Sequence, residues 1–520
     1  MKLKYLFLSL IVFTSCNDFL DVKPVGKLIP TQTEEFENLL NNVRTLQFHF
    51  MNNNKSSMYA MLGDNLSISE NQDKYLYISS YVNKEVYAAY VFSLPYENPN
   101  QPQYTWEWGI YRATGIFNNV IEGIEGLDGA AETETGKAVI AQAKAGRAWS
   151  YMVGGLGYGR MYNPNGQNDA KTIPYRTSAD PATANPDLST TAELMALVKK
   201  DLDDALDAPE NVANPCRANK AAVHALRAEY FMYMRDWTNM LKEASLAWEK
   251  SVALKGSVDN LIYDLNQFYY QDDPNAQPAE GTDKELSLEL VGQDLLITQT
   301  TNKENLFYRE APNGGVTSNG TATFYPSDDF LALFDAATDR RYQLFALRLL
   351  GYSTTVGGVK YDDGIRRTYC RESKMMGNQG ITYPQLLLMK AEAEARTSDK
   401  TNALKDLNLL RKYRYSGSNT DLPNGSSLTE DELLYEILKE RRRELPLSSY
   451  QRAFDIKRFV YDTGKPWCQS AMTHKIGTKV YSAPVDDEYF TLPKANSIIR
   501  LNPQWGLEED HRSYNPTGNK

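Results

Sequence analysis

The stretch from Thr382 to Phe459 constrains the fold of this chain of 520 residues more than any other stretch does. Apolar residues recur there at helical spacing, in three segments with marked ends. The first segment opens at Pro384, because the N–H that a proline lacks would have no partner in a first helical turn. The third begins at Thr429 and Glu432, which have capping-box spacing. It stops before Pro446, since the residue preceding a proline is pushed out of the helical region.

The second segment starts near Ser398 and ends in a loop rich in Ser, Gly and Asn over residues 416–427. Antiparallel pairs of short helices joined by tight turns build tetratricopeptide-type arrays. An ordinary helical bundle has the same periodicity, so both architectures stay open on this evidence. Similar helical patterns lie upstream and predict several helix pairs separated by long insertions, at residues 33–43, 104–124, 136–156, 191–206, 217–237 and 237–254.

The pattern changes between residues 260 and 363. Leucines alternate with polar residues over 286–290, as in a strand. Residues 305–309 have the composition of another short strand, and the pair Gly357 and Gly358 could close a turn. We therefore predict a mainly α fold, with tetratricopeptide-like helix pairs forming a superhelical scaffold and a loop-rich irregular subdomain that carries a few short β strands.

The N-terminus has the pattern of an exported lipoprotein. Residues 1–15 combine a short basic start, an apolar run and small residues before Cys16. The run is too short to span a membrane and is typical of an export signal. A cysteine directly after such a signal indicates acylation of its thiol, and several acyl chains would hold the protein where a single chain is marginal. We predict a signal peptide over 1–15 and a lipidated tether over 16–32, the alternative being an ordinary cleaved signal with Cys16 incidental.

Composition and motifs exclude several classes of function. The formal net charge of −10 argues against nucleic-acid binding, which needs a cationic surface. The chain contains no zinc-protease, P-loop or nucleophile-elbow motif. We predict no catalytic residue, no cofactor and no metal site, although Asp272 and Asp273 could help to hold a hard cation. His224 is expected to be a satisfied interface histidine.

Two groups of residues leave alternatives open. The carboxylates of Glu392, Glu394, Glu440 and Glu444 lie on predicted helices and are expected either to face solvent or to pair with nearby arginines. The remaining cysteines are expected to be buried small side chains, of which at most two could form a disulfide. These cysteines are Cys216, Cys370 and Cys468.

Tyrosine is abundant, with 34 copies, and suits both wet contact surfaces and cores. Six tyrosines are scattered through the irregular region 64–103, at positions 75, 77, 81, 87, 90 and 96. This region is a candidate recognition surface. It could equally be a packed region with its rings inside. Two further aromatic clusters lie at residues 268–270 and 307–308.

Several motifs resemble the SusD/RagB family of outer-membrane lipoproteins of Bacteroidetes. In the C-terminal part they are Ala391-Glu392-Ala393, residues 407–411, 440–445 and 452–459, and the Ser327–Arg340 segment. In the N-terminal part they are the strings at 104–124, 147–162 and 217–237. Asp18 and Asp21 match the acidic opening that in this family accompanies display on the cell surface. The resemblance thus extends over an N-terminal region, 33–260, and a C-terminal region, 261–520, which includes the helix block 382–459.

The resemblance implies a non-catalytic protein anchored to the outer membrane and exposed at the cell surface. Family members bind a nutrient, usually a glycan and sometimes a peptide, and close over a SusC-like TonB-dependent transporter. The alternatives are a surface glycosidase or esterase and a helical-repeat scaffold. Glycan binding would use aromatic faces, and the sequence predicts these ligand-binding residues: Tyr96, Phe268, Tyr269, Tyr270 and Tyr308. Cys16 is the predicted lipidation site.

Overall fold

The computed structural model describes residues 30–46, 58–77, 84–103, 105–271, 275, 277–286, 290–292, 299–310, 324–375, 377–447, 449–485 and 488–515. The predicted signal peptide, Cys16 and most of the tether lie outside these residues. The same holds for Tyr81 and for the pair Asp272 and Asp273.

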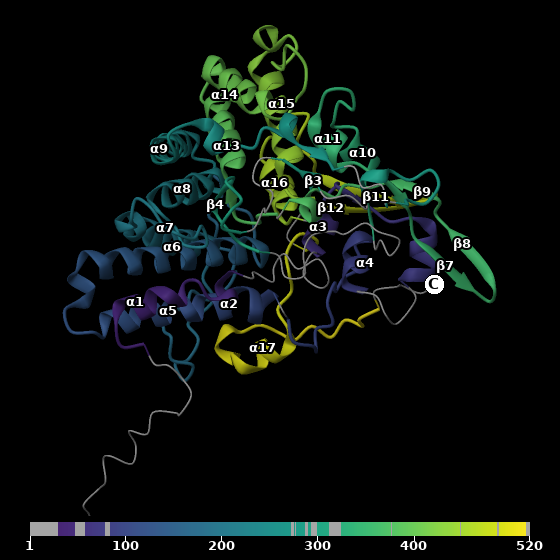
Figure 1. Cartoon of the computed structure of the whole chain (residues 1–520). Coiled ribbons are helices and arrows are strands. Elements are labelled where there is room, and N and C mark those ends of the chain that lie inside the picture. The colour runs from purple at the N-terminus through teal and green to yellow at the C-terminus, as the bar shows by residue number, and fades with distance from the viewer. Residues whose placement is uncertain are drawn as a thin grey trace, which may run out of the picture.

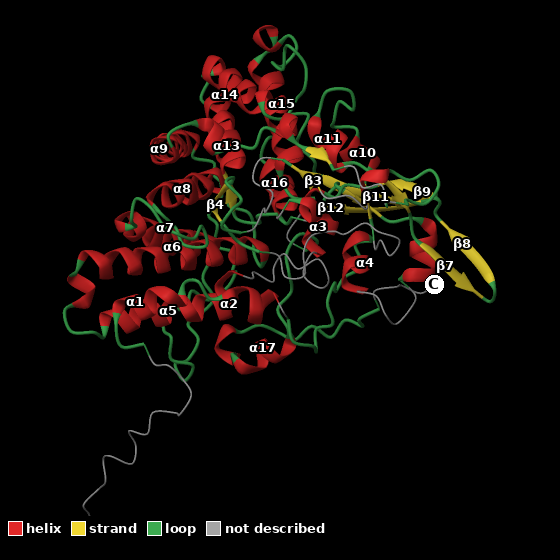
Figure 2. Ribbon diagram, in the orientation of Figure 1, coloured by secondary structure: helices red, strands yellow, loops and turns green. Residues whose placement is uncertain are grey.

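Helices dominate the fold (Figure 2). The α-helices are α1 (Thr33–Leu39), α2 (Val43–Leu46), α3 (Met58–Leu62), α4 (Lys84–Tyr90), α5 (Arg112–Glu125), α6 (Glu134–Gly157), α7 (Thr191–Asp204), α8 (Lys220–Met234), α9 (Trp237–Lys255), α10 (Asp328–Leu331), α11 (Arg340–Phe345), α12 (Arg371–Lys374), α13 (Tyr383–Arg396), α14 (Lys400–Lys412), α15 (Glu430–Glu444), α16 (Gln451–Phe459) and α17 (Asn496–Leu501). Two π-helical segments are η3 (Gln72–Leu76) and η4 (Thr105–Tyr111). Short 3-10 turns include η9 (Lys284–Leu286) and η11 (Pro503–Trp505).

The strands form antiparallel pairs in place of one large sheet. They are β1 (Leu66–Ser67) with β5 (Tyr325–Pro326), β2 (Tyr269–Tyr270) with β3 (Leu290–Val291), β4 (Asn305–Phe307) with β10 (Ile381–Thr382), β6 (Arg348–Leu350) with β9 (Ile365–Arg367), β7 (Ser353–Val356) with β8 (Val359–Asp362), and β11 (Ala471–Ile476) with β12 (Lys479–Pro484). Gly357 and Gly358 close the β7–β8 hairpin with positive φ angles of 60° and 83°, which glycine adopts readily.

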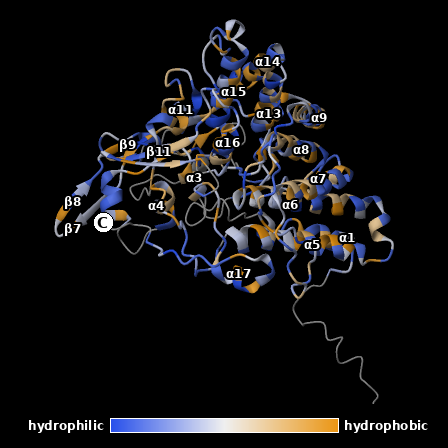
Figure 3. Ribbon diagram, turned by 180° about the vertical axis from the view of Figure 1, so that it is seen from behind, coloured by the Kyte–Doolittle hydropathy of each residue, from blue (hydrophilic) through white to orange (hydrophobic). Residues whose placement is uncertain are grey.

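The larger helices stack side by side as antiparallel neighbours. Helix α5 packs on α6, α6 on α7, α8 on α9, α9 on α13, and α13 on both α14 and α15. Figure 1 shows this stack rising from α5 and α6 to α14, with α3, α4 and most strand pairs on its other side. Hydrophobic and hydrophilic residues share the stacked helices, as amphipathic packing requires (Figure 3). The predicted mainly α fold, built from helix pairs and short strands, is confirmed.

The ends of the helices follow the predicted chemistry, and the structure differs from the prediction in one helix and one strand. Thr429 and Glu432 form the capping box of α15, and Thr382 and Gln385 form another at α13. The block 382–459 contains a further helix, α16, which lies beyond the predicted stop at Pro446 and was not predicted from the periodicity. Of the expected strand over 286–290, Leu286 lies in the 3-10 turn η9 and Leu290 lies in β3, and residues 287–289 lie outside the described part of the chain.

One continuous apolar core joins the two halves of the chain. It contains residues from Met58 in α3 to Ile498 in α17. A second cluster lies between α1, α5 and α6. The division into regions 33–260 and 261–520 stays a prediction about the sequence. Within the described part of the chain, every helix is too short or too polar to cross a bilayer. Cys216 and Cys370 are buried, and Cys216, Cys370 and Cys468 form no disulfide with one another.

Close contact between α5 and α6 yields a stability test. A Cβ atom on Gly146 of α6 would lie 2.4 Å from the Phe117 ring, whereas one on Gly115 of α5 would meet nothing within 4 Å. We expect Gly146→Ala to lower the free energy of unfolding by about 1–3 kcal/mol through overpacking. Gly115→Ala should leave it unchanged or raise it by up to about 1 kcal/mol. Urea unfolding of both variants measures the difference, and equal stabilities would contradict the packing described.

Candidate functional site

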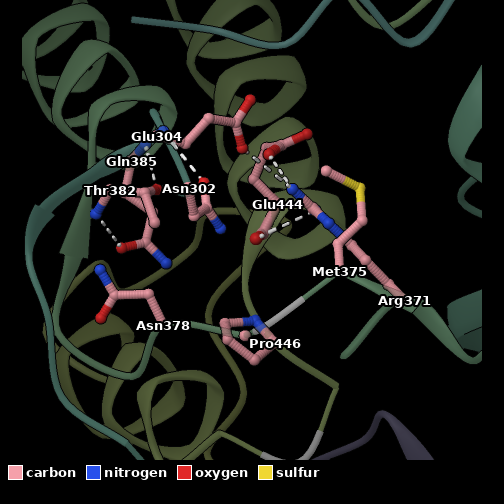
Figure 4. A pocket seen from close by; sticks show the side chains of 10 residues that line it. Asn302, Glu304, Arg371, Met375, Asn378, Thr382, Gln385, Glu444 and Pro446 are labelled. Atoms are coloured by element: carbon pink, nitrogen blue, oxygen red, sulfur yellow. Dashed lines mark hydrogen bonds and ion pairs between the residues drawn. The ribbon is translucent and has the colours of Figure 1, made fainter. Parts of the chain in front are cut away.

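A small polar pocket lies at the base of α13 and α15 (Figure 4). Its volume is about 30 Å³, room for about one water molecule. Glu304, Arg371 and Glu444 converge on one side of it, and Thr382 and Gln385 form the capping box of α13 on the other. A space of this size serves the packing of the helices and does not accommodate a nutrient.

Glu444 is the centre of the charges around this pocket. Its carboxylate accepts hydrogen bonds from Arg341 and Arg414, each at 2.7 Å, and from Arg371 at 3.0 Å. Burial raises its pKa, but the three arginines hold the pKa well below its usual range. Of the two alternatives predicted for the helical glutamates, pairing with arginines applies to Glu392, Glu440 and Glu444. Glu394 is also buried but pairs with Lys390.

Glu392 on α13 is held in the same way. Arg458 of α16 donates to both of its oxygens, and Arg396 adds a third hydrogen bond at 2.9 Å. Burial raises the pKa of Glu392, but these arginines lower it to about 2. A carboxyl whose pKa is depressed by folding stabilises the fold above its unfolded pKa of 4.5. That contribution is lost as the pH falls from 4.5 toward about 2.

The larger opening is a groove of about 410 Å³, within the range of small-molecule sites. It lies between η4, the start of α5 and the segment 174–185. Its lining combines aromatic rings with hydroxyl, amide and guanidinium groups. The lining residues are Trp106, Glu107, Tyr111, Arg112, Thr114, Gly115, Pro174, Arg176, Ser178, Ala179, Pro181 and Asn185. We refer to it as the groove.

A buried relay fixes the outer wall of the groove. Asp201 of α7 forms an ion pair with Arg147 of α6 at 2.7 Å, and Arg147 donates to the Asn118 side chain of α5 at 2.8 Å. Asn118 in turn donates to the carbonyl oxygens of Arg176 and Ser178. The helices thereby hold the backbone of the wall segment, so the groove is formed before any ligand arrives.

The C-terminal segment completes the wall. Trp505 of η11 lies 6.2 Å from Trp106 between ring centroids and donates its indole N–H to the Pro186 carbonyl. Asn502 accepts a hydrogen bond from Asn185 at 2.9 Å. Residues more than 300 positions apart in sequence therefore meet at the groove.

Trp108 adds an exposed aromatic surface beside the groove. Its side chain is 45% exposed, and the Arg112 guanidinium lies 5.0 Å from its ring. Tyr111, one helical turn along, donates to the Pro174 carbonyl at 2.8 Å and so joins the two sides of the groove. The string 104–124, predicted from its periodicity to be helical, therefore supplies one side of the groove.

The five aromatic residues predicted to bind ligand lie elsewhere and do not form one surface. Tyr96, Phe268 and Tyr308 are at most 2% exposed and pack in the interior. Tyr270 is half-buried and donates to the Leu344 carbonyl, whereas Tyr269 is 62% exposed. Adjacent strand residues point to opposite faces, which separates these two rings. The ligand-binding role of the five residues stays a prediction, with an open ring face at Tyr269.

The tyrosine-rich region 64–103 is mostly packed. Tyr77, Tyr87, Tyr90 and Tyr96 are buried. Tyr75 is half-buried and lies 4.1 Å from the Tyr361 ring of β8, between ring centroids. The alternative of rings held inside therefore applies to most of this region.

Sequence reasoning missed the polar half of the groove. No periodic pattern in the sequence marks Arg176, Asn185 or Trp505, and their partners come from distant segments.

His224 pairs with Glu243 at 2.7 Å between α8 and α9, as expected for an interface histidine. Among the described residues, no group of His, Cys, Asp or Glu is arranged to hold a metal ion.

Comparison with solved structures defines the class of protein. A SusD superfamily protein of Bacteroides thetaiotaomicron superposes with a TM-score of 0.62 at 18% identity, covering 91% of this chain and 98% of the other. A SusD superfamily protein of Bacteroides fragilis gives 0.62 at 18% identity, covering 92% and 100%. A putative sugar-binding protein of Bacteroides vulgatus gives 0.61 at 16% identity, covering 92% and 98%. The chain thus has the SusD-like fold over nearly its whole length.

The family comparison agrees. Residues 381–504 match the model of the SusD family, a range that contains α13 to α17. The resemblance to SusD/RagB proteins read from the sequence is confirmed, by family match in this region and by fold across the rest. No curated protein matches the chain.

The buried charges predict a steep cost for removing one of them. We expect Glu444→Gln to lower the free energy of unfolding by about 3–5 kcal/mol, because it leaves arginines buried without their shared carboxylate. Glu436→Gln, on the same helix, breaks only the partly exposed pair with Lys439 and should cost about 0–1 kcal/mol. Thermal and urea unfolding compare the two variants. A Glu444 variant as stable as the Glu436 variant would contradict the central role of this carboxylate.

Proposed function

We propose that this protein is a lipid-anchored, surface-exposed outer-membrane protein that binds a nutrient non-covalently, an oligosaccharide in particular, and delivers it to a SusC-like TonB-dependent transporter. The SusD family match and the SusD-like fold support this proposal. A structural neighbour described as a putative sugar-binding protein supports the ligand class. The observation that carries the proposal is the groove, in which aromatic rings lie beside hydroxyl and amide groups.

The composition of the groove suits reversible capture of a sugar. A pyranose ring presents C–H surfaces to an aromatic face and hydroxyl groups to polar side chains. Burying 80–100 Å² of apolar area on one ring contributes roughly 2–2.5 kcal/mol. One or two such contacts, with the Ser178 and Asn185 side chains alongside, give a weak site from which a ligand can pass to a transporter.

The groove favours binding over catalysis. A glycosidase sets two carboxyl groups across the scissile bond. Among the residues that line the groove, Glu107 is the single carboxylate. We therefore propose that the bound ligand leaves chemically unchanged.

A groove-filling variant tests the ligand site. Because a side chain at Gly115 would extend into open space, we expect Gly115→Phe to fill the groove while the fold is retained. Asn119→Phe places the same ring on an exposed position of α5, outside the groove. A calorimetric screen of soluble oligosaccharides and peptides should find a ligand that loses at least about tenfold in affinity with Gly115→Phe and keeps it with Asn119→Phe.

Three results would contradict this proposal. One is the absence of binding throughout the screen, and another is turnover of a polysaccharide by the purified protein. The third is full binding by Gly115→Phe together with loss of binding in Tyr269→Ala, which would assign the ligand to the β2–β3 edge.

The anchor and the transporter are tested together in cells. We expect the wild-type protein, extracted from outer membranes through a C-terminal tag, to carry acyl chains on Cys16 and to bring a large barrel protein with it. Cys16→Ser removes the acylated thiol and should release the protein from the membrane fraction. Mass spectrometry of the N-terminal peptide and of the co-purified proteins is the measurement. An unacylated wild-type N-terminus would refute the anchor, and extraction without a barrel would refute the transporter.

A further inference from the structure

The charge of the groove differs from that of the chain as a whole. The chain has a formal net charge of −10. Arg112 and Arg176 line the groove against one carboxylate, the exposed Glu107. At the outer end, the Glu122 carboxylate accepts a hydrogen bond from the Ala179 N–H. The lining of the groove, with two arginines against one carboxylate, is therefore cationic on an acidic protein.

Arg176 is held entirely by neutral groups. Its guanidinium donates to the carbonyl oxygens of Ser178, Asp180 and Thr183 and to the Asn185 side-chain oxygen. These bonds fix its position without neutralising its charge. The Asp180 carboxylate accepts from the Ala182 N–H, so it is oriented by the wall segment and not by Arg176. A guanidinium has five N–H groups, and these four hydrogen bonds use four of them.

Arg112 brings a second guanidinium to the same groove, over the face of Trp108. Burial lowers its pKa, and the like charge of Arg44 on α2 lowers it further. The protonated form of Arg112 is thus disfavoured by its surroundings. An anion placed between Arg112 and Arg176 would offset both effects, because the attraction between opposite charges strengthens as water is displaced.

We propose that the groove selects oligosaccharides that carry a carboxylate, that is, glycans containing uronic acid units. A guanidinium recognises a carboxylate through charge-assisted N–H donors, and Arg176 has one such N–H outside its four hydrogen bonds. We take Arg112 and Arg176 as the specificity-determining residues. The rings of Trp106 and Tyr111 and the side chain of Ser178 then contact the sugar ring. This inference rests on the proposed function and names the ligand class of that same groove.

The lining favours an acidic sugar over an acidic peptide. An extended peptide is usually held through its backbone at an exposed strand edge. The groove is bordered by helical turns and by the segment 174–185, in which the structure assigns no strand. Aromatic surface with hydroxyl and amide groups around it matches a ring bearing several hydroxyls. Binding of peptides is accordingly one of the results that the test must exclude.

The test compares each acid with its neutral form on the unmodified protein. Calorimetry is performed with oligogalacturonate, oligomannuronate and oligoglucuronate, each beside its methyl ester. We expect at least one free acid to bind about tenfold or more tightly than its ester at low salt, since a charge-assisted contact is lost in the ester. The difference should shrink as sodium chloride is added, because salt screens partly exposed charges.

Matched variants localise the effect. Arg112→Gln should bring the affinity for the acid close to that for the ester, whereas Arg366→Gln, the same change on exposed β9, should leave both unchanged. Melting temperatures confirm that both variants fold. Equal binding of acid and ester, or an unaffected Arg112 variant, would overturn the inference. If neutral glycans bind and Gly115→Phe abolishes that binding, the proposed function stands and this inference fails. If no ligand of any class binds, both fail.

Discussion

Buried pairing between arginines and carboxylates is the interaction on which the rest of this structure depends. Arg458 joins Glu392 of α13 to Asp455 of its own helix, and Arg441 of α15 reaches the same aspartate. Charges removed from water are tolerated only when each finds its partner with good geometry. These three helices consequently have one register in which all the ion pairs form. The paired residues belong to the family-like motifs at 391–393, 440–445 and 452–459.

The same chemistry ties the C-terminal helices to the N-terminal half. Arg442 and Arg452 both pair with Asp64, which lies two residues before β1. Beyond the helix block, the chain returns to the N-terminal helices, where the Leu492 N–H donates to the Gly157 carbonyl. Because of this return, η11 lies against the segment that forms the outer wall of the groove. The ligand site proposed here is thus a product of both halves of the chain.

The two polar regions of the molecule differ in how their charges are satisfied. Around Glu444 every arginine meets a carboxylate, which gives rigidity and a space for about one water molecule. In the groove, Arg176 is positioned by neutral oxygens, so these hydrogen bonds do not neutralise its charge. A guanidinium that is fixed in position but not neutralised is preorganised for an anion, because little free energy is needed to order its side chain on binding.

The sequence by itself determined the helices, their caps and the resemblance that the comparisons bear out. These features depend on local spacing, as at Thr429 and Glu432 of the α15 capping box. It did not determine which aromatic rings are exposed, so Tyr96 and Phe268 read like Tyr269 although their environments are opposite. Nor could the sequence show that Trp505 lies beside Trp106, because this contact forms only when the C-terminal segment packs against the N-terminal helices. Burial and long-range contact are properties of the packed molecule, and the tertiary structure alone decided them.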